Sequence, residues 1–281
     1  MKYYVLYNPL AGKGDYAEKI EKLTAPYSDT CVLVNLTELN DYGSFIAGLE
    51  KDDEIVLCGG DGTINRFVND TEGIEIENEI LYYPTGTGND FVRDLKDEDV
   101  TKAFSIKKYI KDLPTVEVNG KTYRFLNGVG FGIDGYCCEV GDKKKAKGKR
   151  KINYTMIAIC GLLFKYKPTS AVVTVDGVRH EYKKAWIAPT MNGRFYGGGM
   201  MATPDQDRLA HDGVTAMLFH DSGKLKTLWV FKSIFNGGHV KHPEMVTQLK
   251  GREITVEFSE PRSVQVDGET ILNVKTYTVK A

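Results

Sequence analysis

The chain has 281 residues, which is long enough for two domains that each bury a core. Its 37 basic and 38 acidic residues give a formal net charge of −1, so no global positive field attracts nucleic acid, and we predict no nucleic-acid partner. The cysteines, five in number, do not form a disulfide framework in a chain of this size, which favours a reducing cytoplasm.

The apolar stretches are too short to predict a membrane span. The run at residues 156–164 is far shorter than a bilayer requires. The run at residues 3–7 is too short for a signal peptide and lacks a cleavage pattern. We therefore expect any membrane contact to be peripheral.

The N-terminal part alternates strands and helices in the pattern of a doubly wound, Rossmann-like parallel sheet. Strands are predicted at residues 3–7, 31–34, 54–58 and 80–83. The first strand ends at Asn8 and Pro9. The following turn, which contains Lys13, is not a Walker P-loop, because it lacks the spacing between glycines and the Ser or Thr after the lysine.

The most informative stretch is GGDGTIN at residues 59–65, directly after the buried strand at residues 54–58. Three of its members are glycines: Gly59, Gly60 and Gly62. Glycines let successive backbone N–H groups point into one concavity, and a helix predicted to begin near Thr63 adds its unpaired N–H groups. Such a turn suits a phosphate. Asp61 beside a phosphate is repulsive unless Mg²⁺ or a hydrogen-bond donor lies between them, so the loop predicts a nucleotide bound with its metal.

A second loop of the same build, PTGTGNDF at residues 84–91, follows the strand predicted at residues 80–83. Either loop alone is more simply a strand-to-helix turn. Two glycine turns at the carboxyl ends of strands in one sheet, however, stand where open α/β folds bind ligands. Their pairing favours a nucleotide site.

Beyond residue 115 the pattern changes to that of β-hairpins. Asn-Gly or Asp-Gly pairs separate strand-forming runs at residues 119–120, 176–177 and 267–268. We therefore predict an α/β domain at residues 1–120 and an antiparallel β-sandwich domain at residues 121–281.

One strong charge block, residues 143–151, holds seven cations in nine residues. A solvated loop is the ordinary interpretation of such a run. Because the block precedes an apolar helix predicted at residues 154–164, it also suits docking on an anionic membrane surface. Nucleic acid fits less well, since no aromatic residues alternate with the basic ones.

The pair GGDGTIN and PTGTGNDF resembles the catalytic domain of the diacylglycerol kinase family, which includes bacterial soluble lipid kinases. That family is related to the sphingosine kinases and, more distantly, to the NAD kinases. The resemblance implies an enzyme that uses ATP and Mg²⁺ to phosphorylate a lipid hydroxyl, above all that of diacylglycerol, with its active site in the cleft between the two domains. It implies a cytoplasmic protein bound peripherally to the inner face of the membrane, and it leaves a homodimer open.

The resemblance also implies roles for individual residues. Glu269 is the implied general base, and Asp61 is the implied catalytic residue that acts through Mg²⁺. The implied nucleotide-binding residues are Asn8, Pro9, Lys13, Thr37, Gly59, Gly60, Gly62, Thr63, Asn65, Thr87, Asn89 and Asp90. A structural Mg²⁺ of the bacterial lipid kinases maps to the carboxylate of Asp212 and the backbone carbonyls of Leu209 and Val214.

At three of these positions the residues alone predict an ordinary structural role instead of a functional one. Glu269 stands in an exposed hairpin turn, Asp212 in an ordinary Asp-Gly turn, and Thr37 at a helix N-cap. The chain also departs from the family pattern, because many bacterial members carry an acidic residue, bonded to the loop lysine, where this chain has proline and threonine at residues 114–115. Asp112 or Glu117 is then the candidate replacement.

Two alternative functions remain open from the sequence. One is a kinase of a soluble acceptor, because the NAD kinases share GGDGT. The other is a catalytically inactive nucleotide-binding protein at the membrane. The form PTGTGNDF and the intact acidic residues favour the lipid kinase.

Overall fold

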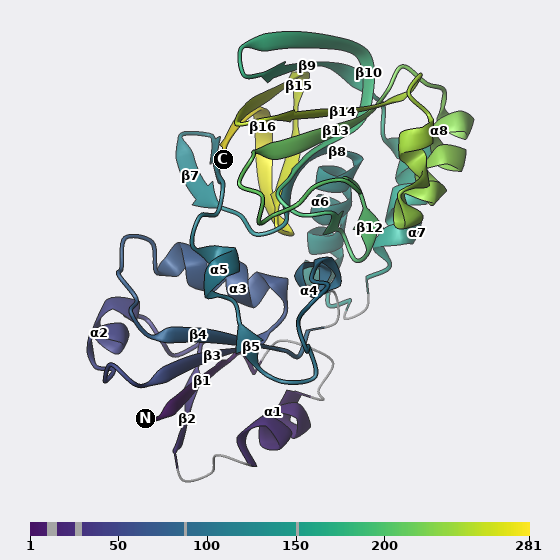
Figure 1. The fold of residues 1–281 in the computed structure, drawn as a ribbon. Coiled ribbons are helices and arrows are strands. Elements are labelled where there is room, and N and C mark those ends of the chain that lie inside the picture. The colour runs from purple at the N-terminus through teal and green to yellow at the C-terminus, as the bar shows by residue number, and fades with distance from the viewer. Residues whose placement is uncertain (10–15, 26–29, 87–88, 150–151) are drawn as a thin grey trace. The chain divides into compact units, whose positions relative to one another are not determined.

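The computed structural model describes residues 1–9, 16–25, 30–86, 89–149 and 152–281 and divides the chain into two compact units, Met1–Leu113 and Pro114–Ala281 (Figure 1). The two units meet between residues 113 and 114, which is N-terminal to the boundary predicted at residue 120. The reason is that strand β6 (Thr115–Val118) pairs with the C-terminal strand β16 (Glu269–Lys280) and so belongs to the second unit. Among the described residues, no helix combines the length and the apolar character needed to cross a membrane.

The first unit has the predicted doubly wound α/β fold. Its sheet has the strand order β2-β1-β3-β4-β5, in which β5 joins antiparallel to β4 and the other strands are parallel. The strands are β1 (Tyr3–Tyr7), β2 (Cys31–Asn35), β3 (Glu54–Gly59), β4 (Glu79–Pro84) and β5 (Phe104–Ser105). The helices are α1 (Tyr16–Thr24), α2 (Tyr42–Ala47), α3 (Asp61–Asp70), α4 (Asp90–Asp94) and α5 (Lys107–Ile110).

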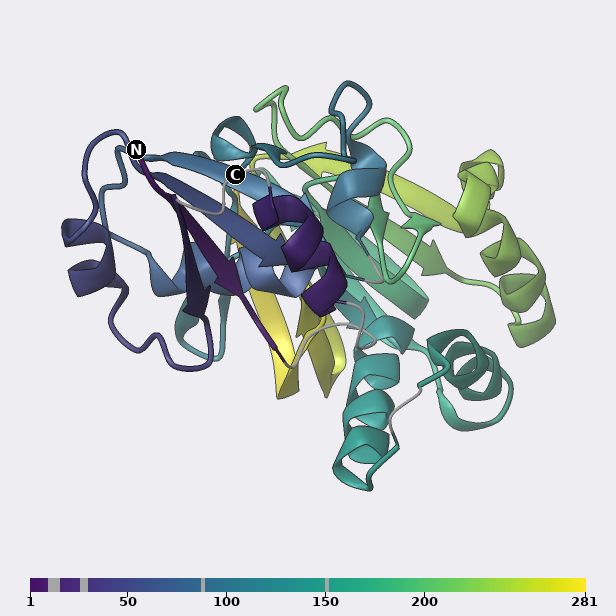
Figure 2. The same cartoon turned by 90° about the horizontal axis from the view of Figure 1, so that it is seen from below.

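Helices cover both faces of this sheet (Figure 1). On one face, Ile20 of α1 packs against Val5 and Val56; Figure 2 looks at the sheet from this side. On the other face, Tyr82 contacts Phe91 of α4 edge to face, with ring centroids 6.0 Å apart. Because β1 and β3 are covered on both sides, β1 and the run at residues 55–58 of β3 are apolar, which is the signal that predicted them.

The second unit is built on an antiparallel sheet, as predicted. Its path runs β14-β13-β10-β8-β15-β16-β6-β7, and β9 pairs with both β10 and β15, which closes β8, β9, β10 and β15 into a ring. The remaining strands of this sheet are β7 (Lys121–Arg124), β8 (Gly128–Gly132), β9 (Thr169–Val175), β10 (Val178–Met191), β13 (Val214–His220), β14 (Val246–Gly251) and β15 (Glu253–Val266). A short separate hairpin consists of β11 (Phe195–Tyr196) and β12 (Met200–Met201).

Each face of this sheet has its own hydrophobic core. Along β13, Ala216 and Leu218 pack into the core enclosed by the strands, where Phe131 and Phe258 stack with ring centroids 4.2 Å apart. Met217 and Phe219, at the alternate positions of β13, pack on the opposite face against the helices. These helical elements are α6 (Ile133–Ala146), α7 (Tyr154–Cys160), α8 (Lys224–Phe231), the π-helical turn η2 (Gly161–Lys165), and the 3₁₀ turns η3 (Lys232–Asn236) and η4 (Gly238–Lys241).

The hairpins predicted from Asn-Gly and Asp-Gly pairs are present. Asn119, Asp176 and Asp267 have φ angles of 51°, 47° and 45°, and each is followed by a glycine that also has positive φ. These are the angles of a type I′ turn, whose twist matches that of the flanking strands. The basic run at residues 143–151 is not simply the loop that its composition predicted, because its first residues form the C-terminal end of α6. Residues 150–151 lie outside the described ranges.

Candidate functional site

The strand order of the first unit reverses direction at β1. The chain places β2 on one side of β1 and then returns to place β3 on the other side. In open α/β sheets, ligands bind outside the carboxyl ends of the strands at such a switch point. Here Asn8 and Pro9 follow β1, and the turn at residues 59–63 follows β3. The residues that the sequence singled out for a nucleotide therefore flank the position where the topology favours one.

The two glycine turns touch through their backbones. The amides of Thr85 and Gly86 donate to the carbonyl oxygen of Gly59 at 2.9 and 3.0 Å. The Tyr82 hydroxyl donates to the same oxygen at 2.9 Å. A Cβ on Gly86 would lie 2.5 Å from the Cα of Gly60, which is closer than any side chain tolerates. The approach of the two turns therefore requires glycine.

Helix α3 begins at Asp61, two residues before the predicted start at Thr63, with Gly60 as its N-cap. The Asp61 carboxylate accepts a hydrogen bond from the backbone amide of Asp90 at 2.8 Å and from that of Phe91 at 3.4 Å. It therefore joins the first turn of α3 to the first turn of α4, where a negative charge is also stabilised by the helix dipole. This role in positioning the second loop was not predicted, and the catalytic role of Asp61 through Mg²⁺ stays a prediction.

Replacing Asp61 by alanine should lower the free energy of unfolding by about 1–3 kcal/mol, because amide donors at the start of α4 lose their acceptor. Urea unfolding of the variant and of the native chain measures the difference. Asp61→Asn, which keeps a side-chain oxygen, is the matched control and should lose less. An unchanged urea midpoint in Asp61→Ala would contradict the positioning role.

A nucleotide phosphate and Mg²⁺ fit the residues at these turns. The Asn89 side chain donates to the carbonyl of Gly86 at 3.1 Å, whereas its buried Oδ1 has no hydrogen-bond partner within the described ranges. Asp90 beside it is only 4% exposed. Carboxylate and carbonyl oxygens are the ligands that Mg²⁺ prefers. Asp61, Asn89 and Asp90 are therefore the residues that would hold Mg²⁺.

Other predicted nucleotide-binding residues of the first unit lie around the same edge of the sheet. Thr63 and Asn65 belong to the first turns of α3, where the Thr63 amide donates to the Gly60 carbonyl at 2.9 Å. Gly62 is exposed, and a Cβ there would meet nothing within 4 Å. Lys13 and Thr87 lie outside the described residues.

Thr37 follows β2 at this edge and is exposed. Its hydroxyl donates to the side-chain oxygen of Asn35 at 2.8 Å. The alternative of a helix N-cap at Thr37 is wrong, because Asp41 caps the next helix, α2, by accepting from the Ser44 amide at 2.9 Å.

In the second unit, Glu269 is exposed at the first position of β16, directly after the type I′ turn at residues 267–268. The turn is anchored by Asp267, whose carboxylate accepts hydrogen bonds from three successive backbone amides, those of residues 126–128. Such a run of amides is an anion-binding nest, here filled by a side chain of the protein. Asp267 therefore fixes the turn that carries the candidate base.

The loop at residues 126–128 is itself held by buried polar side chains. Arg208, only 8% exposed, donates to the Leu126 carbonyl at 3.2 Å and to the side-chain oxygen of Asn127 at 3.1 Å. Asn192 donates to the same Leu126 carbonyl at 3.0 Å. The sequence analysis missed Arg208, whose partners are more than eighty positions away. The Asn-Gly pairs at residues 127–128 and 192–193 were the available signal.

Asp134, in the second unit, is a buried acid to which the sequence analysis assigned no role. It lies in the first turn of α6 and is 8% exposed. Burial raises the pKa of Asp134 to about 7, against the opposing effect of the hydrogen bond from the Gly135 amide. Burial therefore favours the protonated form of this carboxyl group.

In the turn predicted to hold a structural Mg²⁺, the Asp212 carboxylate is paired with a lysine ammonium from β14. Lys250 donates to the Asp212 carboxylate at 2.6 Å, and this bond holds the pKa of Asp212 below its usual range. Arg252 donates to the neighbouring His211 carbonyl at 3.3 Å. Leu209 and Val214 flank this turn. As arranged, these residues do not fit a divalent cation, and the metal assignment to Asp212, Leu209 and Val214 stays a prediction.

Replacing Asp212 by alanine should therefore lower the melting temperature by less than about 4 °C, because an exposed ion pair contributes little. The shift should be the same with and without Mg²⁺. Differential scanning calorimetry with and without Mg²⁺ measures the melting temperatures of the variant and of the native chain. A drop that occurs only when Mg²⁺ is present would instead support a bound metal.

The acidic partner of Lys13 also stays a prediction. Glu117 is exposed on β6, where it pairs in register with Thr278 of β16. Because Lys13 lies outside the described residues, the choice between Asp112 and Glu117 is not decided by the fold.

Comparison with known proteins agrees with both units. Residues 2–116 match the profile of the diacylglycerol kinase catalytic domain, and residues 127–278 match that of the YegS C-terminal NAD kinase beta sandwich-like domain. A protein of Bacillus subtilis (strain 168) named diacylglycerol kinase is 25% identical over 277 residues, which cover 94% of this chain and 88% of the relative. One of Mycobacterium tuberculosis (strain H37Rv) with the same name is 26% identical over 226 residues, which cover 77% and 70%.

Solved structures agree as well. The crystal structure of a diacylglycerol kinase from Bacillus anthracis superposes with a TM-score of 0.67 at 22% sequence identity, covering 99% of this chain and 94% of that one. At this identity the likeness establishes the fold.

Proposed function

The chain belongs to the diacylglycerol kinase catalytic-domain family, and on that premise we propose that it transfers the γ-phosphoryl group of ATP to a lipid hydroxyl. Diacylglycerol is the proposed acceptor, and phosphatidic acid is the proposed product. Two relatives that cover most of their own length in the comparison carry the name diacylglycerol kinase.

One observation carries the proposal: the contact between the glycine turns that follow β3 and β4, next to the switch point at β1. The turn at residues 59–63 and the turn at residues 84–89 meet without intervening side chains, and Asp61 joins the helices that follow them. Two glycine turns in close contact, beside the carboxylates of Asp61 and Asp90, suit a polyphosphate with its Mg²⁺.

Phosphoryl transfer depends on positioning and charge neutralisation more than on covalent help from the protein. Backbone amides of residues 59–63 would bind the phosphates, and Asn65 and Thr87 would orient them. Mg²⁺, when bound, supplies neutralisation of the phosphate charge. Glu269 would accept the proton of the attacking lipid hydroxyl.

The proposed lipid acceptor also bears on the location of the protein in the cell. A lipid hydroxyl is presented at a membrane surface, and we propose that the chain meets it as a cytoplasmic protein bound peripherally to an anionic inner leaflet. The described residues contain no membrane-crossing helix, which is compatible with this arrangement.

ADP release, followed in a coupled assay with ATP and Mg²⁺, tests the proposed reaction. Dioleoylglycerol in mixed micelles should raise the rate well above the rate with micelles alone, whereas NAD should not. A rate that rises only with NAD would overturn the lipid as acceptor. Measurable ATP binding without release under any of these conditions would count against an active kinase.

A further inference from the structure

Two helical segments of the second unit expose large apolar side chains. On α7 and η2, Met156 is 54% exposed and Phe164 is 75% exposed. On α8, Leu225 is 78% exposed and Trp229 is 66% exposed. Leu225 and Trp229 are four residues apart, so they lie on one side of α8. We call these four residues the apolar patch.

The two segments are neighbours although they are far apart in sequence. Lys224, at the start of α8, donates to the backbone carbonyl of Leu163 in η2 at 3.0 Å. Their inner sides share one core, which contains Leu162 of η2 and Val230 of α8. The buried sides thus face the sheet, and the apolar patch lies on the solvent side.

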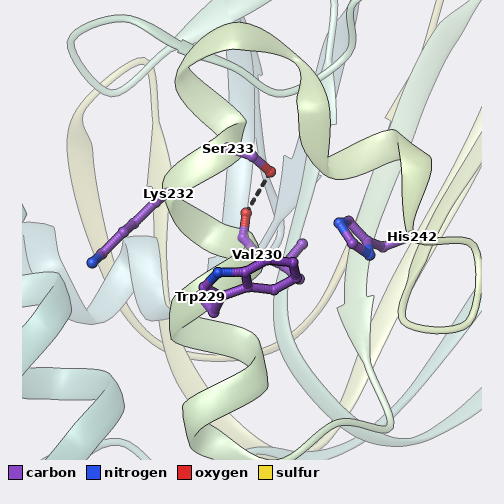
Figure 3. A pocket seen from close by; sticks show the side chains of 5 residues that line it. All are labelled: Trp229, Val230, Lys232, Ser233 and His242. Atoms are coloured by element: carbon purple, nitrogen blue, oxygen red, sulfur yellow. Dashed lines mark hydrogen bonds between the residues drawn. The ribbon is translucent and has the colours of Figure 1, made fainter.

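Trp229 has a defined place on this surface. Its indole lies edge to face against the ring of His242, with centroids 5.5 Å apart. Trp229 lines a surface cavity of about 420 Å³ together with Lys232 and Ser233. Figure 3 shows these side chains. The indole is therefore oriented by a neighbour yet remains open to solvent.

The two chain segments that carry the apolar patch contain basic residues and no acidic ones. Residues 153–167 and 223–241 together contain six lysines and no aspartate or glutamate. Lys226 pairs with Glu244 at 2.8 Å, whereas Lys165 and Lys232 have no acidic partner in the described part of the chain. At the end of α6, next to α7, Lys144 likewise has no acidic partner among the residues that the structure describes.

We infer that the apolar patch and its lysines form the surface by which this protein docks on an anionic lipid bilayer. Amphipathic segments with lysines beside Trp, Phe and Leu lie in the interface plane of a membrane, where indole rings concentrate. A second copy of the chain is a poorer occupant, because a two-fold contact would bring two surfaces together that both carry lysines. The inference rests on the proposed function, since a lipid kinase must reach an acceptor held in a membrane.

Trp229 provides a direct readout of docking. The chain has two tryptophans, and the other, Trp186, is only 2% exposed. Adding vesicles of phosphatidylglycerol and phosphatidylcholine should shift the emission to shorter wavelength, and brominated acyl chains should quench it. Vesicles of phosphatidylcholine alone should have little effect. In Trp229→Phe, the remaining emission should not respond to either kind of vesicle.

Variants measured by vesicle sedimentation test the surface further. Leu225→Ser should weaken binding to phosphatidylglycerol vesicles about tenfold or more, and Lys165→Ala about fivefold. Val178→Ser is the matched control, because Val178 is an apolar residue on the β9–β10 hairpin that is also exposed, at 60%. It should bind like the native chain.

The inference and the proposed function fail separately. Turnover of a short-chain, monomerically dissolved diacylglycerol reports the reaction without a membrane. Such turnover, combined with no response of Trp229 to anionic vesicles, would overturn the docking surface and leave the kinase. Vesicle binding without turnover would overturn the kinase and leave the docking surface. A stable dimer that Leu225→Ser dissociates would show that a second copy covers the patch, which also overturns the inference.

Discussion

Replacing Glu269 by glutamine should lower turnover about 10²- to 10⁴-fold while leaving ATP binding and the melting temperature unchanged. The glutamine keeps the size of the side chain but cannot accept the proton of the lipid hydroxyl. Because Glu269 is exposed at the first position of β16, no packing is lost. Steady-state kinetics with diacylglycerol micelles, together with calorimetric titration of ATP, measures both quantities.

The matched control is Glu253→Gln, which changes an exposed glutamate at the first position of β15 in the same unit. It should keep native turnover. Undiminished turnover in Glu269→Gln would remove this residue from the mechanism.

Asp267→Asn should also lower turnover, because the backbone amides at residues 126–128 would then bind the turn that carries Glu269 less firmly.

Replacing Gly86 by alanine should separate the two glycine turns. The new Cβ would lie 2.5 Å from the Cα and 2.9 Å from the amide nitrogen of Gly60, and backbone atoms cannot move aside as a flexible side chain can. The expected cost to the free energy of unfolding is about 1–3 kcal/mol. The dissociation constant for ATP should rise as well, because the contact between the turns forms the proposed phosphate site.

Gly62→Ala separates these two effects. A Cβ at Gly62 meets nothing within 4 Å, so the urea midpoint should stay near the native value. ATP should still bind more weakly if the amides of this turn face the phosphates. A Gly86→Ala variant with native stability and native ATP affinity would contradict the requirement for close contact between the turns.

The sequence predicted the first unit well because its strands carry local signals. Apolar runs mark the central strands of this sheet, and glycine turns follow β3 and β4 directly. The type I′ hairpins at Asn119, Asp176 and Asp267 were predictable for the same reason, since positive φ favours Asn, Asp and Gly at these positions.

Helix α6 was missed because its sequence is shaped by packing. A Cβ on Gly135 would lie 1.8 Å from the Ser263 carbonyl oxygen, and one on Gly141 would lie 2.6 Å from the Tyr154 ring. Glycines that allow a close approach also weaken helix propensity, so the helical signal was lost. The closure of the second sheet through β9 could not be predicted from the sequence either, since β9 pairs with β15 some eighty residues later.

The site was predictable in its residue types and less so in its connections. Asp61 stood out as an acid in a glycine turn, yet its bond to the amide of Asp90 joins positions 29 residues apart. The ion pair between Asp212 and Lys250 spans 38 residues and changes what the Asp212 turn offers to a cation. Long-range partners of this kind leave no periodic or local mark in a sequence.

The most direct test of phosphoryl transfer from ATP to a lipid hydroxyl compares ATP labelled on the γ-phosphate with ATP labelled on the α-phosphate. The native chain, Mg²⁺ and diacylglycerol micelles are incubated, and the lipids are extracted and separated. We predict that γ-label appears in phosphatidic acid, that α-label does not, and that Glu269→Gln forms little labelled lipid. Label that never enters the lipid fraction, or that enters it equally from both positions, would contradict a γ-phosphoryl transfer to lipid.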